Sequence, residues 1–320
     1  MAKVEIPQTR IGSMGATMPL ICFGTSYSVL APSEFLKPSV VNAIRLGYRH
    51  FDTAAFYNSE ECLGEAVTEA LSLGLIKSRA DLFITSKLWC SDAHSDRVLP
   101  ALQKTLKNLG MEYVDLYLIH FPVSLKPGSQ GIPFPSEDVL LMDFKSVWEA
   151  MEKCQSLGLS RNIGVSNFSS KKLETILSSA KIPPAVNQVE LNPLWQQKKL
   201  REYCRKNNVH LSGFSPLGAP NTWWGNNRVL DCEVLKSIAK ARGKTVAQVC
   251  LRWCYQQGAS VIVKSFSKER MVENLEIFDW ELSAAECREI EQIPQQKGYT
   301  GHHFISSEGP YKSFEQFWDE

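Results

Sequence analysis

The first half of the sequence contains four polar side chains whose types can carry out proton transfer together: Asp52, Tyr57, Lys87 and His120. A tyrosine titrates near ~10 and is a poor acid at neutral pH, but a cation within ~4–6 Å can lower such a pKa by about 1–3 units. Lys87 can be that cation, with Asp52 as the counter-ion that keeps it charged. His120 can donate a hydrogen bond to a carbonyl oxygen. The set predicts a proton donor for an oxyanion, without a nucleophile and without a metal.

The segment HFDTAAFY, residues 50–57, also has an ordinary structural interpretation. Asp52 alone can cap a loop through the backbone. Asn58 is a candidate N-cap of a following helix, and Glu61 three residues later resembles the partner of a capping box. Tyr57 would then stand at the position of a hydrophobic staple, and taken alone it favours this structural role.

Short β-rich runs alternate along the chain with amphipathic helical stretches. Residues 60–72 and 96–109 place apolar residues on one face at a period near 3.6, and the second stretch stops at Gly110, which suits a helix C-terminus. Most runs are continuously apolar, as expected for strands that are covered on both faces. Eight strands alternating with helices predict a (β/α)8 TIM barrel. The runs are LICFGT, YRHFDT, DLFITSKLW, VDLYLIHFP, NIGVSN, AVNQVEL, HLSGFSP and SVIVKSF.

In such a barrel, polar residues at the carboxyl ends of the strands are candidates for chemistry. Asp52, Lys87 and His120 stand near the ends of successive runs, at separations of 87 − 52 = 35 and 120 − 87 = 33 residues, one β/α unit each. Alone, Lys87 is more often solvated and His120 more often a hydrogen-bonded core residue. Convergence with Tyr57 on one barrel mouth favours an active site instead.

The remaining segments fit around a barrel. VEIPQTRIGSMGATMPL resembles a hairpin with Met14-Gly15 near its turn, which can cap the N-terminal end of the barrel. Segments 121–143 and 216–230 are long, follow strands and belong on the active face. The aromatic tail, 295–320, is expected to pack back onto the body. No low-complexity linker divides the chain, so we expect a single domain over residues 1–320.

Charge and composition exclude several classes of function. Lys and Arg number 35 and Asp and Glu 34, which leaves a formal charge of +1 and favours neither nucleic acid nor a membrane surface as a partner. No apolar stretch approaches the ~20 residues of a membrane span, and the first residues lack the apolar core of a secretory signal. Nine scattered cysteines without a C-x-x-C motif suit free thiols. We therefore expect a cytoplasmic protein.

Further motifs accompany the four polar residues: GYRHFDTA, LFITSKLW, VDLYLIH, IGVSNF, NQVELNP, FSPLG and VIVKSFSKERMVEN. In these motifs, and in the order and spacing of the four residues, nearly the whole chain resembles the aldo-keto reductase superfamily. The resemblance implies reduction of a carbonyl by hydride transfer, with Tyr57 protonating the oxygen. It also implies a reduced nicotinamide cofactor held in extended form on the barrel, and the sequence contains no G-x-G-x-x-G of a Rossmann domain.

The resemblance, matched residue by residue, implies a cofactor-binding set. Two cations and two hydroxyls beside a strand end suit a phosphate dianion, since each charged hydrogen bond contributes roughly 1.5–3 kcal/mol, and this favours NADPH over NADH. The alternative is that Lys264 and Arg270 belong to an ordinary solvated helix start. The set comprises Gly24, Thr25 and Asp52 at the nicotinamide, Ser166, Asn167 and Gln188 at the carboxamide, Ser215 and Leu217 at the pyrophosphate, Lys264, Ser265, Phe266, Ser267 and Arg270 at the adenosine 2′-phosphate, and Glu273 and Asn274 at the adenine.

Two residues depart from the pattern of the superfamily. Phe214 stands where the family usually stacks a tyrosine on the nicotinamide, so stacking is kept and a hydroxyl is lost. Phe121 follows the histidine where the family often has tryptophan, which alters a wall that faces the substrate. Substrate preference therefore cannot be copied from the best-known members.

Within the superfamily, FITSKLWCSDAHSDRVLPAL, PVSLKPG and WELSAAE resemble plant reductases of specialised metabolism, among them codeinone, methylecgonone, chalcone-pathway and deoxymugineic acid reductases. An aromatic pocket favours a bulky apolar ketone, such as an alkaloid intermediate, over a free sugar. The two adjacent tryptophans of this pocket can equally be packing residues. We expect a monomer whose only partner is a small-molecule carbonyl. The candidate substrate residues are Tyr27, Trp89, His120, Phe121, Trp223 and Trp224.

Two other functions stay open from the sequence. A lyase or aldolase-type barrel can use Lys87 as a Schiff-base amine, but this leaves segment 264–274 without a role. A binding or regulatory protein can hold the cofactor on a reductase fold without turnover, although the intact set of four polar residues argues against it.

Overall fold

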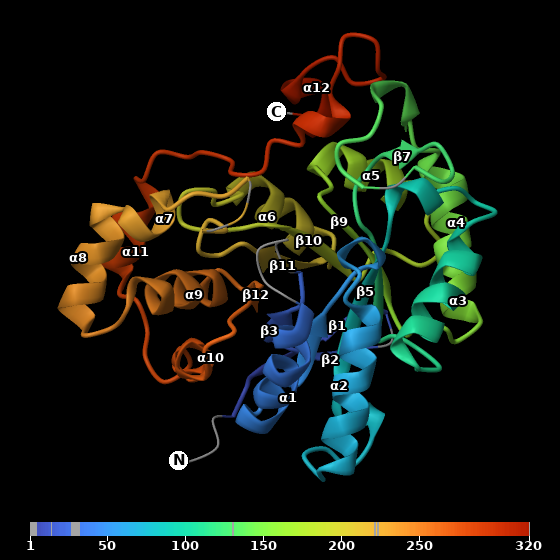
Figure 1. The fold of residues 1–320 in the computed structure, drawn as a ribbon. Helices are drawn as coiled ribbons and strands as arrows, with labels where there is room; N and C mark the ends of the chain where they lie inside the picture. The colour runs from blue at the N-terminus through green and yellow to red at the C-terminus, as the bar shows by residue number, and fades with distance from the viewer. Residues whose placement is uncertain are drawn as a thin grey trace.

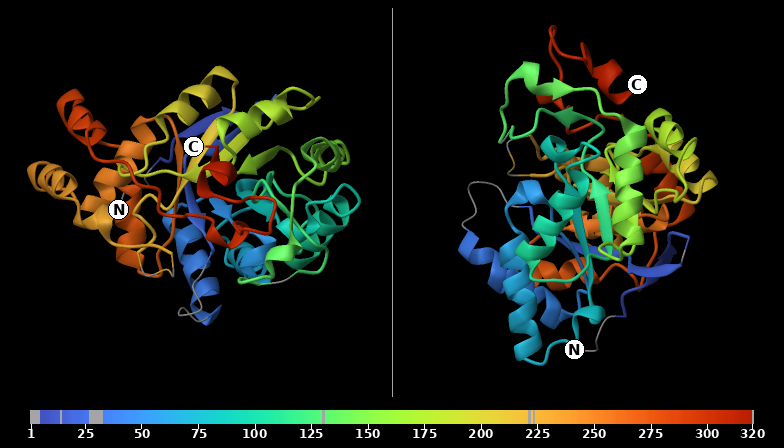
Figure 2. Two further views of the ribbon diagram at one scale, coloured as in Figure 1. Left: turned by 90° about the horizontal axis from the view of Figure 1, so that it is seen from above. Right: turned by 90° about the vertical axis from the view of Figure 1, so that its right-hand side faces the viewer.

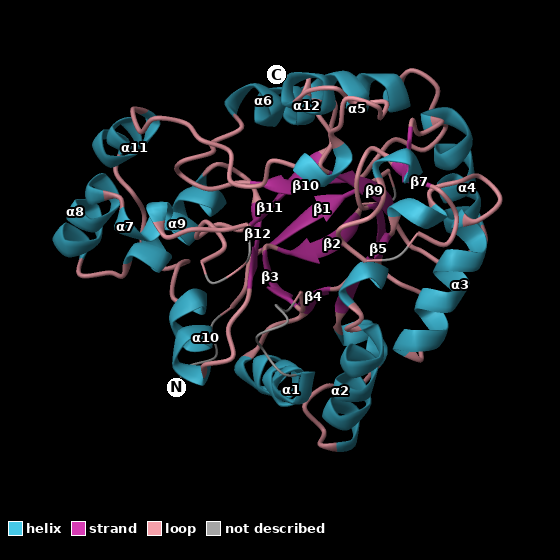
Figure 3. Cartoon of the chain, turned by 45° about the horizontal axis from the view of Figure 1, so that its top comes forward, coloured by secondary structure: helices cyan, strands magenta, loops and turns pink. Residues whose placement is uncertain are grey.

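Eight parallel strands close into a barrel in the computed structural model, which describes residues 5–13, 15–26, 33–129, 131–220, 222 and 224–319. Helices surround this barrel (Figures 1 and 3). Around the barrel the order is β3, β4, β5, β6, β9, β10, β11 and β12, and β12 pairs with β3. The predicted (β/α)8 barrel is confirmed. The strands are β3 Ile21–Gly24, β4 His50–Asp52, β5 Phe83–Leu88, β6 Leu116–Ile119, β9 Ile163–Ser166, β10 Val186–Glu190, β11 His210–Phe214 and β12 Ser260–Val263.

The barrel strands are rich in apolar and β-branched residues and are covered on both faces. Their continuous apolar runs in the sequence predict this. All six residues of β5 are buried, and Lys87 is one of them. The register pairs Gly24 with Asp52, Asp52 with Thr85, and Lys87 with Leu118. Because every barrel strand runs in the same direction, the carboxyl ends of β4, β5 and β6 lie at one mouth.

The helices on the outside bury one apolar face against the strands. Helix α2 has the predicted bounds, and α3 begins two residues later than predicted and ends before Gly110, which adopts φ 62°. A Cβ at Gly64 in α2 would lie 2.3 Å from the carbonyl oxygen of Leu109, so glycine is required for this close helix contact. The helices are α1 Leu36–Leu46, α2 Glu60–Ser72, α3 Val98–Leu109, α4 Phe144–Ser156, α5 Ser170–Leu177, α6 Lys198–Lys206, α7 Arg228–Asp231, α8 Glu233–Arg242, α9 Val246–Gln256, α10 Lys268–Leu275, α11 Ala284–Glu291 and α12 Phe314–Trp318.

An antiparallel hairpin, β1 Gln8–Ile11 and β2 Ala16–Pro19, precedes the barrel, as predicted. Ile11 and Met18 pack against Phe83 and Leu116, the first residues of β5 and β6. The hairpin therefore covers the N-terminal end of the barrel. Met14, expected near its turn, lies outside the described residues.

The opposite end of the barrel is covered by loop 121–143 and by the C-terminal tail, which lie side by side in two views (Figures 1 and 2). The loop contains a small antiparallel pair, β7 Ser124–Leu125 and β8 Val139–Leu140. Phe304 and Phe317 of the tail are buried in an aromatic cluster with Phe121 and Trp89. The prediction that the tail packs back onto the body is confirmed.

Within the described ranges, no helix combines the length and the apolar character that crossing a bilayer requires.

Candidate active site

The four polar residues converge at the mouth of the barrel. Nζ of Lys87 donates to Oδ1 of Asp52 at 2.6 Å, and lies 3.4 Å from Oη of Tyr57. Oη of Tyr57 also lies 3.4 Å from Nε2 of His120. These residues come from three strand ends and one loop, and they lie together as their spacing in the sequence predicts. The phenol oxygen stands between an ammonium group and an imidazole, which is an arrangement that can move one proton to a neighbouring oxygen.

Further hydrogen bonds fix the ion pair in the barrel. Lys87 has no exposed surface, and its ammonium also donates to the carbonyl oxygen of Thr53 at 2.9 Å. The second carboxylate oxygen of Asp52 accepts from Nε2 of Gln188 at 2.8 Å. Both charges are therefore paired and hydrogen-bonded, which is the condition under which buried charges are tolerated.

Tyr57 is placed by a short 3-10 turn, Ala55–Tyr57, rather than by the predicted capping box. Asn58 adopts a left-handed conformation (φ 54°) that ends this turn, and α2 begins after Ser59. The expectation of an N-cap at Asn58 with Glu61 is wrong. Asn58 bends the chain, because short polar side chains tolerate this backbone region.

Ser59 is engaged in a buried hydroxyl network instead of a helix cap. Its Oγ lies 2.8 Å from Oγ1 of Thr25 and 2.8 Å from Oγ1 of Thr53. Thr25 also donates to the carbonyl oxygen of Asp52 at 3.0 Å. This network joins the ends of β3 and β4 to the start of α2 and so fixes the loop that carries Tyr57.

The electrostatic environment keeps the proton on Tyr57. Burial raises the pKa of the Tyr57 phenol; the charge of Lys87 lowers it and that of Asp52 raises it further. Lys87 thus acts on this pKa in the expected direction, but desolvation of the phenolate outweighs the neighbouring cation, and the pKa of Tyr57 is raised overall. Burial also acts to lower the pKa of Lys87, but the attraction of Asp52 and then Tyr57 raises it overall. The lysine stays charged and the phenol stays protonated.

His120 is neutral at physiological pH. Burial, and then the charge of Lys87, hold the pKa of the imidazole well below its ordinary value. Nδ2 of Asn167 donates to the carbonyl oxygen of His120 at 2.9 Å, which fixes its backbone. Nδ1 is buried, and no described residue hydrogen-bonds to it. A neutral imidazole whose proton is on Nε2 can donate to an oxygen beside the phenol.

Aromatic rings pack around His120. The Phe121 ring stacks on the imidazole with centroids 5.2 Å apart, and the Trp89 ring meets it edge-on at 5.3 Å. Trp224 contacts Tyr299 at 5.5 Å. The candidate residues Trp89, Phe121 and Trp224 therefore lie in one wall region, whereas Tyr27 and Trp223 lie outside the described residues.

Three aromatic residues of this wall were not predicted. Phe56 stacks on Trp89 with centroids 3.9 Å apart, and Tyr299 and Phe304 of the tail contact Phe121 at 5.5 and 5.1 Å. Phe56 stands next to Tyr57 in HFDTAAFY and could have been found there. The two tail residues are brought in by long-range packing, for which the sequence shows only a run of aromatics.

Segment 264–274 follows β12 directly and forms the start of α10. Ser267 is the N-cap, and its Oγ accepts from the backbone N–H of Arg270 at 3.3 Å. Nζ of Lys264 donates to the carbonyl oxygen of Ser26 at 2.8 Å. Lys264, Ser265, Ser267 and Arg270 thus gather around a helix N-terminus, where backbone N–H groups and the helix dipole favour an anion.

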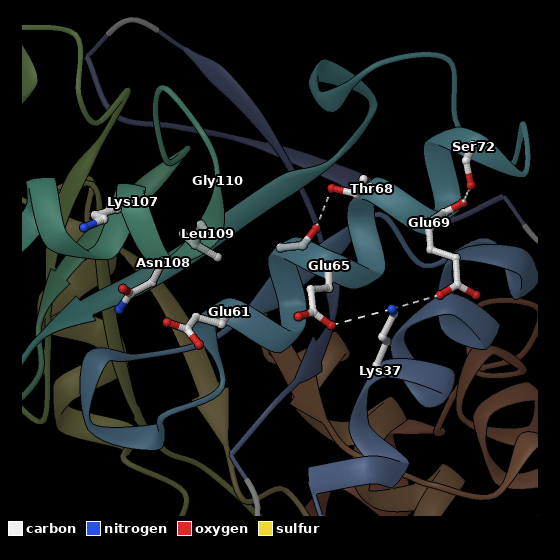
Figure 4. A pocket seen from close by; sticks show the side chains of 11 residues that line it. Lys37, Glu61, Glu65, Thr68, Glu69, Ser72, Lys107, Asn108, Leu109 and Gly110 are labelled. Atoms are coloured by element: carbon white, nitrogen blue, oxygen red, sulfur yellow. Dashed lines mark hydrogen bonds and ion pairs between the residues drawn. The ribbon is translucent and has the colours of Figure 1, made fainter.

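A groove lies elsewhere, on the outer surface between α1, α2 and α3 (Figure 4). Lys37 spans part of it, with Nζ 3.5 Å from Glu65 and 3.3 Å from Glu69. None of the four polar residues lines this groove. Its charged, exposed side chains form an ordinary solvated helix surface rather than a site for carbonyl chemistry.

Comparison with known proteins decides the family. A model of the Aldo/keto reductase family matches residues 20–295. The chain belongs to the aldo-keto reductase family. It is 61% identical over 320 residues to the 7-acetyl-epi-neemfruitin B aldo-keto reductase of Melia azedarach, over 100% of this chain and 99% of that one. It is 58% identical over 308 residues to the NADPH-dependent codeinone reductase 1-4 of Papaver somniferum, over 96% of each chain.

A solved structure of another aldo-keto reductase agrees with this family assignment. The crystal structure of a Bombyx mori aldo-keto reductase in complex with NADP matches with a TM-score of 0.85 and 33% identity, over 93% of this chain and 96% of that one. This aldo-keto reductase is therefore an NADP-dependent oxidoreductase, and its cofactor is NADP(H). Its general reaction is the NADPH-dependent reduction of small-molecule carbonyl compounds.

The residues of this aldo-keto reductase suit that cofactor. The cations and hydroxyls at the start of α10 match the chemistry of a phosphate dianion. At the mouth, the amide groups of Asn167 and Gln188 donate to His120 and Asp52, and amide groups are suitable partners for a carboxamide. Oγ of Ser166 lies 3.2 Å from Nδ2 of Asn167.

Other predicted cofactor residues occupy neighbouring strand ends. Phe214 ends β11 and is half-buried, and Ser215 follows with φ 51°, a left-handed turn that directs the chain into loop 216–230. Leu217 packs against the core beside this turn. Gly24 ends β3, where a Cβ would lie 3.0 Å from Cγ2 of Ile262.

Two further predicted residues belong to α10. Oε1 of Glu273 accepts from Oγ1 of Thr245, and Asn274 is buried on α10. Phe266 is half-buried beside Lys264, whose Nζ lies 5.8 Å from its ring centroid. The assignment of these side chains to the cofactor stays a prediction.

Proposed function

We propose that this aldo-keto reductase reduces a bulky, apolar ketone of plant specialised metabolism to an alcohol, with Tyr57 as the proton donor. The observation that supports this most directly is the chain of contacts Asp52–Lys87–Tyr57–His120 at the barrel mouth. The aromatic wall above it supports the choice of an apolar substrate, because large flat rings bury apolar surface well.

The four residues divide the work between them. His120, neutral, donates a hydrogen bond that orients the substrate carbonyl oxygen near the phenol. Tyr57 transfers its proton to that oxygen as negative charge develops on it, and the ammonium of Lys87 stabilises the phenolate that remains. Asp52 keeps Lys87 charged in its buried position. When bound, the reduced nicotinamide supplies the hydride to the carbonyl carbon.

Binding of the cofactor rests on the chain's own donors. Lys264, Ser265, Ser267 and Arg270 would hold the adenosine 2′-phosphate, and Ser166, Asn167 and Gln188 the carboxamide. Phe214 would stack on the nicotinamide ring. Ser215 and Leu217 would lie at the pyrophosphate, and Glu273 and Asn274 at the adenine.

The environment of Lys87 argues against a Schiff-base lyase. An amine that attacks a carbonyl must be deprotonated and accessible, which usually requires a lowered pKa. Lys87 is fully buried, its pKa is raised, and three oxygen atoms surround its ammonium group. A borohydride-trapped adduct on Lys87 would support the lyase instead.

The substrate class can be tested by measuring NADPH oxidation across a panel of alkaloid ketones, other polycyclic plant ketones, polyketides, uronic acids and simple aldehydes. We expect the highest kcat/KM for a polycyclic ketone. A preference for uronic acids or free sugars would contradict the apolar pocket, and no oxidation with any member would favour a cofactor-binding protein without turnover.

We further propose that the chain acts as a cytoplasmic monomer built as a single domain over residues 1–320. Nine free cysteines support a reducing compartment. Gel filtration at micromolar concentration tests the monomer, and a mass twice that of the chain would contradict it.

A further inference from the structure

Glu190, the last residue of β10, stands at the barrel mouth outside the four catalytic candidates. The residue is 4% exposed, and its carboxylate accepts hydrogen bonds from two backbone N–H groups at the start of the C-terminal tail. The N–H of Gly298 lies 3.0 Å from Oε1 and 3.1 Å from Oε2, and the N–H of Tyr299 lies 3.0 Å from Oε2. Nδ2 of Asn192 lies 3.4 Å from Oε1. The carboxylate thus joins the tail to the barrel.

The contact is close enough that a side chain at Gly298 would displace the carboxylate of Glu190. A Cβ at Gly298 would lie 2.6 Å from Oε1 of Glu190, although the backbone there is outside the left-handed region. Burial raises the pKa of Glu190, while the N–H groups of Tyr299 and Gly298 lower it. A carboxylate kept in such a position holds the two tail residues firmly, because an unpaired buried acceptor would be costly.

Tyr299 connects the attached tail to the aromatic residues of the proposed substrate wall. Its ring contacts Phe121 at 5.5 Å and Trp224 at 5.5 Å. Phe121 in turn stacks on His120, whose Nε2 lies 3.4 Å from Oη of Tyr57. The position of the tail backbone therefore sets how far the aromatic wall stands from the proton donor.

The tail is attached a second time at its far end. Nζ of Lys172 on α5 donates to the carbonyl oxygen of Phe317 at 2.7 Å and forms an ion pair with Asp319. Oγ of Ser169 also donates to Asp319. With α12 fixed there, a loss of the Glu190 contact would free the segment that holds Tyr299 while leaving the end of the tail docked.

We propose that Glu190 is a positioning residue that sets the width of the substrate pocket by holding Gly298 and Tyr299 against the end of β10. It touches neither the proton donor nor the imidazole, and acts through Tyr299 on Phe121 and Trp224. This rests on the proposed reduction of bulky ketones at the same mouth, because only a large substrate reaches the wall that the tail provides.

The test compares KM for a polycyclic ketone and for glyceraldehyde, with the Kd for NADPH measured in parallel. In Glu190→Gln, the amide loses the charge and one acceptor for the tail. We expect KM for the ketone to change on the order of tenfold. KM and kcat for glyceraldehyde, and the Kd for NADPH, should stay within about twofold of wild type.

Gly298→Ala perturbs the same contact from the side of the tail. It provides a second test of the proposal if Glu190→Gln folds poorly. It should change the ketone KM in the same selective way. Glu308→Gln, at an exposed position on the same tail, is the matched control and should behave as wild type. Hydrogen exchange of the peptide 295–304 should be faster in the first two variants only.

Two results with the variants would overturn the inference. One is an unchanged ketone KM in both Glu190→Gln and Gly298→Ala. The other is an equal change of KM for glyceraldehyde and of the Kd for NADPH, which would mean general damage to the fold. A wild-type protein that reduces glyceraldehyde but no bulky ketone would contradict the proposed substrate class, and the inference with it.

Discussion

The ammonium group of Lys87 is fully buried and still charged, because oxygen atoms of Asp52, Thr53 and Tyr57 surround it. Removing one partner of a buried ion pair leaves an uncompensated charge and costs about 3–5 kcal/mol, whereas removing both can be nearly neutral. At the scale of single residues, the stability of the fold and proton transfer depend on the same atoms of Lys87 and its partners. Substitutions can separate the effect on stability from the effect on proton transfer.

Lys87→Met should lower the free energy of unfolding by about 3–5 kcal/mol, because it leaves the carboxylate of Asp52 without its cation. The double variant Asp52→Asn/Lys87→Met should recover much of this loss, while kcat stays low in both. Urea unfolding gives the stabilities, and NADPH oxidation gives kcat. Strictly additive losses in the double variant would show that the two charges are not coupled.

Ser59→Ala should destabilise the protein by about 1–3 kcal/mol, because it removes a shared partner of the buried Thr25 and Thr53 hydroxyls. Asn58→Gly next to it should be nearly neutral, since the exposed Asn58 already has a left-handed backbone that glycine adopts easily. Thermal unfolding distinguishes them. A larger loss in Asn58→Gly than in Ser59→Ala would support a helix cap at Asn58 after all.

At the scale of elements, the strands and the main helices were predictable because their apolar pattern is local. The bounds of α2 were predicted in full, and the Gly110 stop of α3 followed from its chemistry. The N-cap of α2 was predicted at Asn58 instead of Ser59, because the sequence does not show that the hydroxyls of Thr25 and Thr53 contact Ser59. The docking of the tail could be expected only in outline, since its contacts with Glu190 and Phe121 join residues more than 100 positions apart.

An ion pair between α8 and α11 gives a prediction at this scale. Two hydrogen bonds from Arg242, at 2.7 and 2.6 Å, hold the pKa of Glu286 at about 2. Its folded pKa lies below the unfolded value, so its stabilisation is present above about pH 4.5 and is lost as pH falls through about 2.

Glu286→Gln should therefore cost about 1 kcal/mol at pH 7, a figure kept small because Arg242 is partly exposed. Glutamine retains the hydrogen-bonding role at this third position of α11, so the charge is tested alone. The difference in unfolding free energy from wild type should shrink toward pH 2. A difference that stays constant from pH 7 to pH 3 would contradict the assignment.

At the scale of the whole molecule, the barrel holds three neutral imidazoles, those of His50 and His120 buried and that of His210 half-buried. Burial lowers the pKa of His50 to about 4 and that of His210 to about 4, and holds that of His120 well below its ordinary value. Nε2 of His210 accepts from the N–H of Ser260 at 3.2 Å, which requires an unprotonated nitrogen. From the sequence, only His120 could be singled out, because it stands at a strand end. The desolvation of His50 and His210 depends on closure of the barrel.

Acid should weaken the fold well above the titration range of carboxylates. Below about pH 6.5 the unfolded chain binds protons that the folded protein excludes until about pH 4, so stability falls as pH decreases through this window. Each histidine can contribute up to about 3 kcal/mol. Urea midpoints between pH 7 and 4 should fall steeply, and less steeply in His210→Gln. Equal slopes in the variant and the wild type would contradict this origin.

The central claim is that Tyr57 donates the proton during carbonyl reduction, and Tyr57→Phe tests it most directly. With a good ketone substrate and saturating NADPH, kcat should fall by about 10²–10⁴-fold, because the only group lost is the proton donor. Binding of NADPH should be retained. Tyr255→Phe, which removes a hydroxyl from α9 at a distance from the mouth, should leave kcat unchanged. Turnover by Tyr57→Phe at the wild-type rate would contradict the assignment.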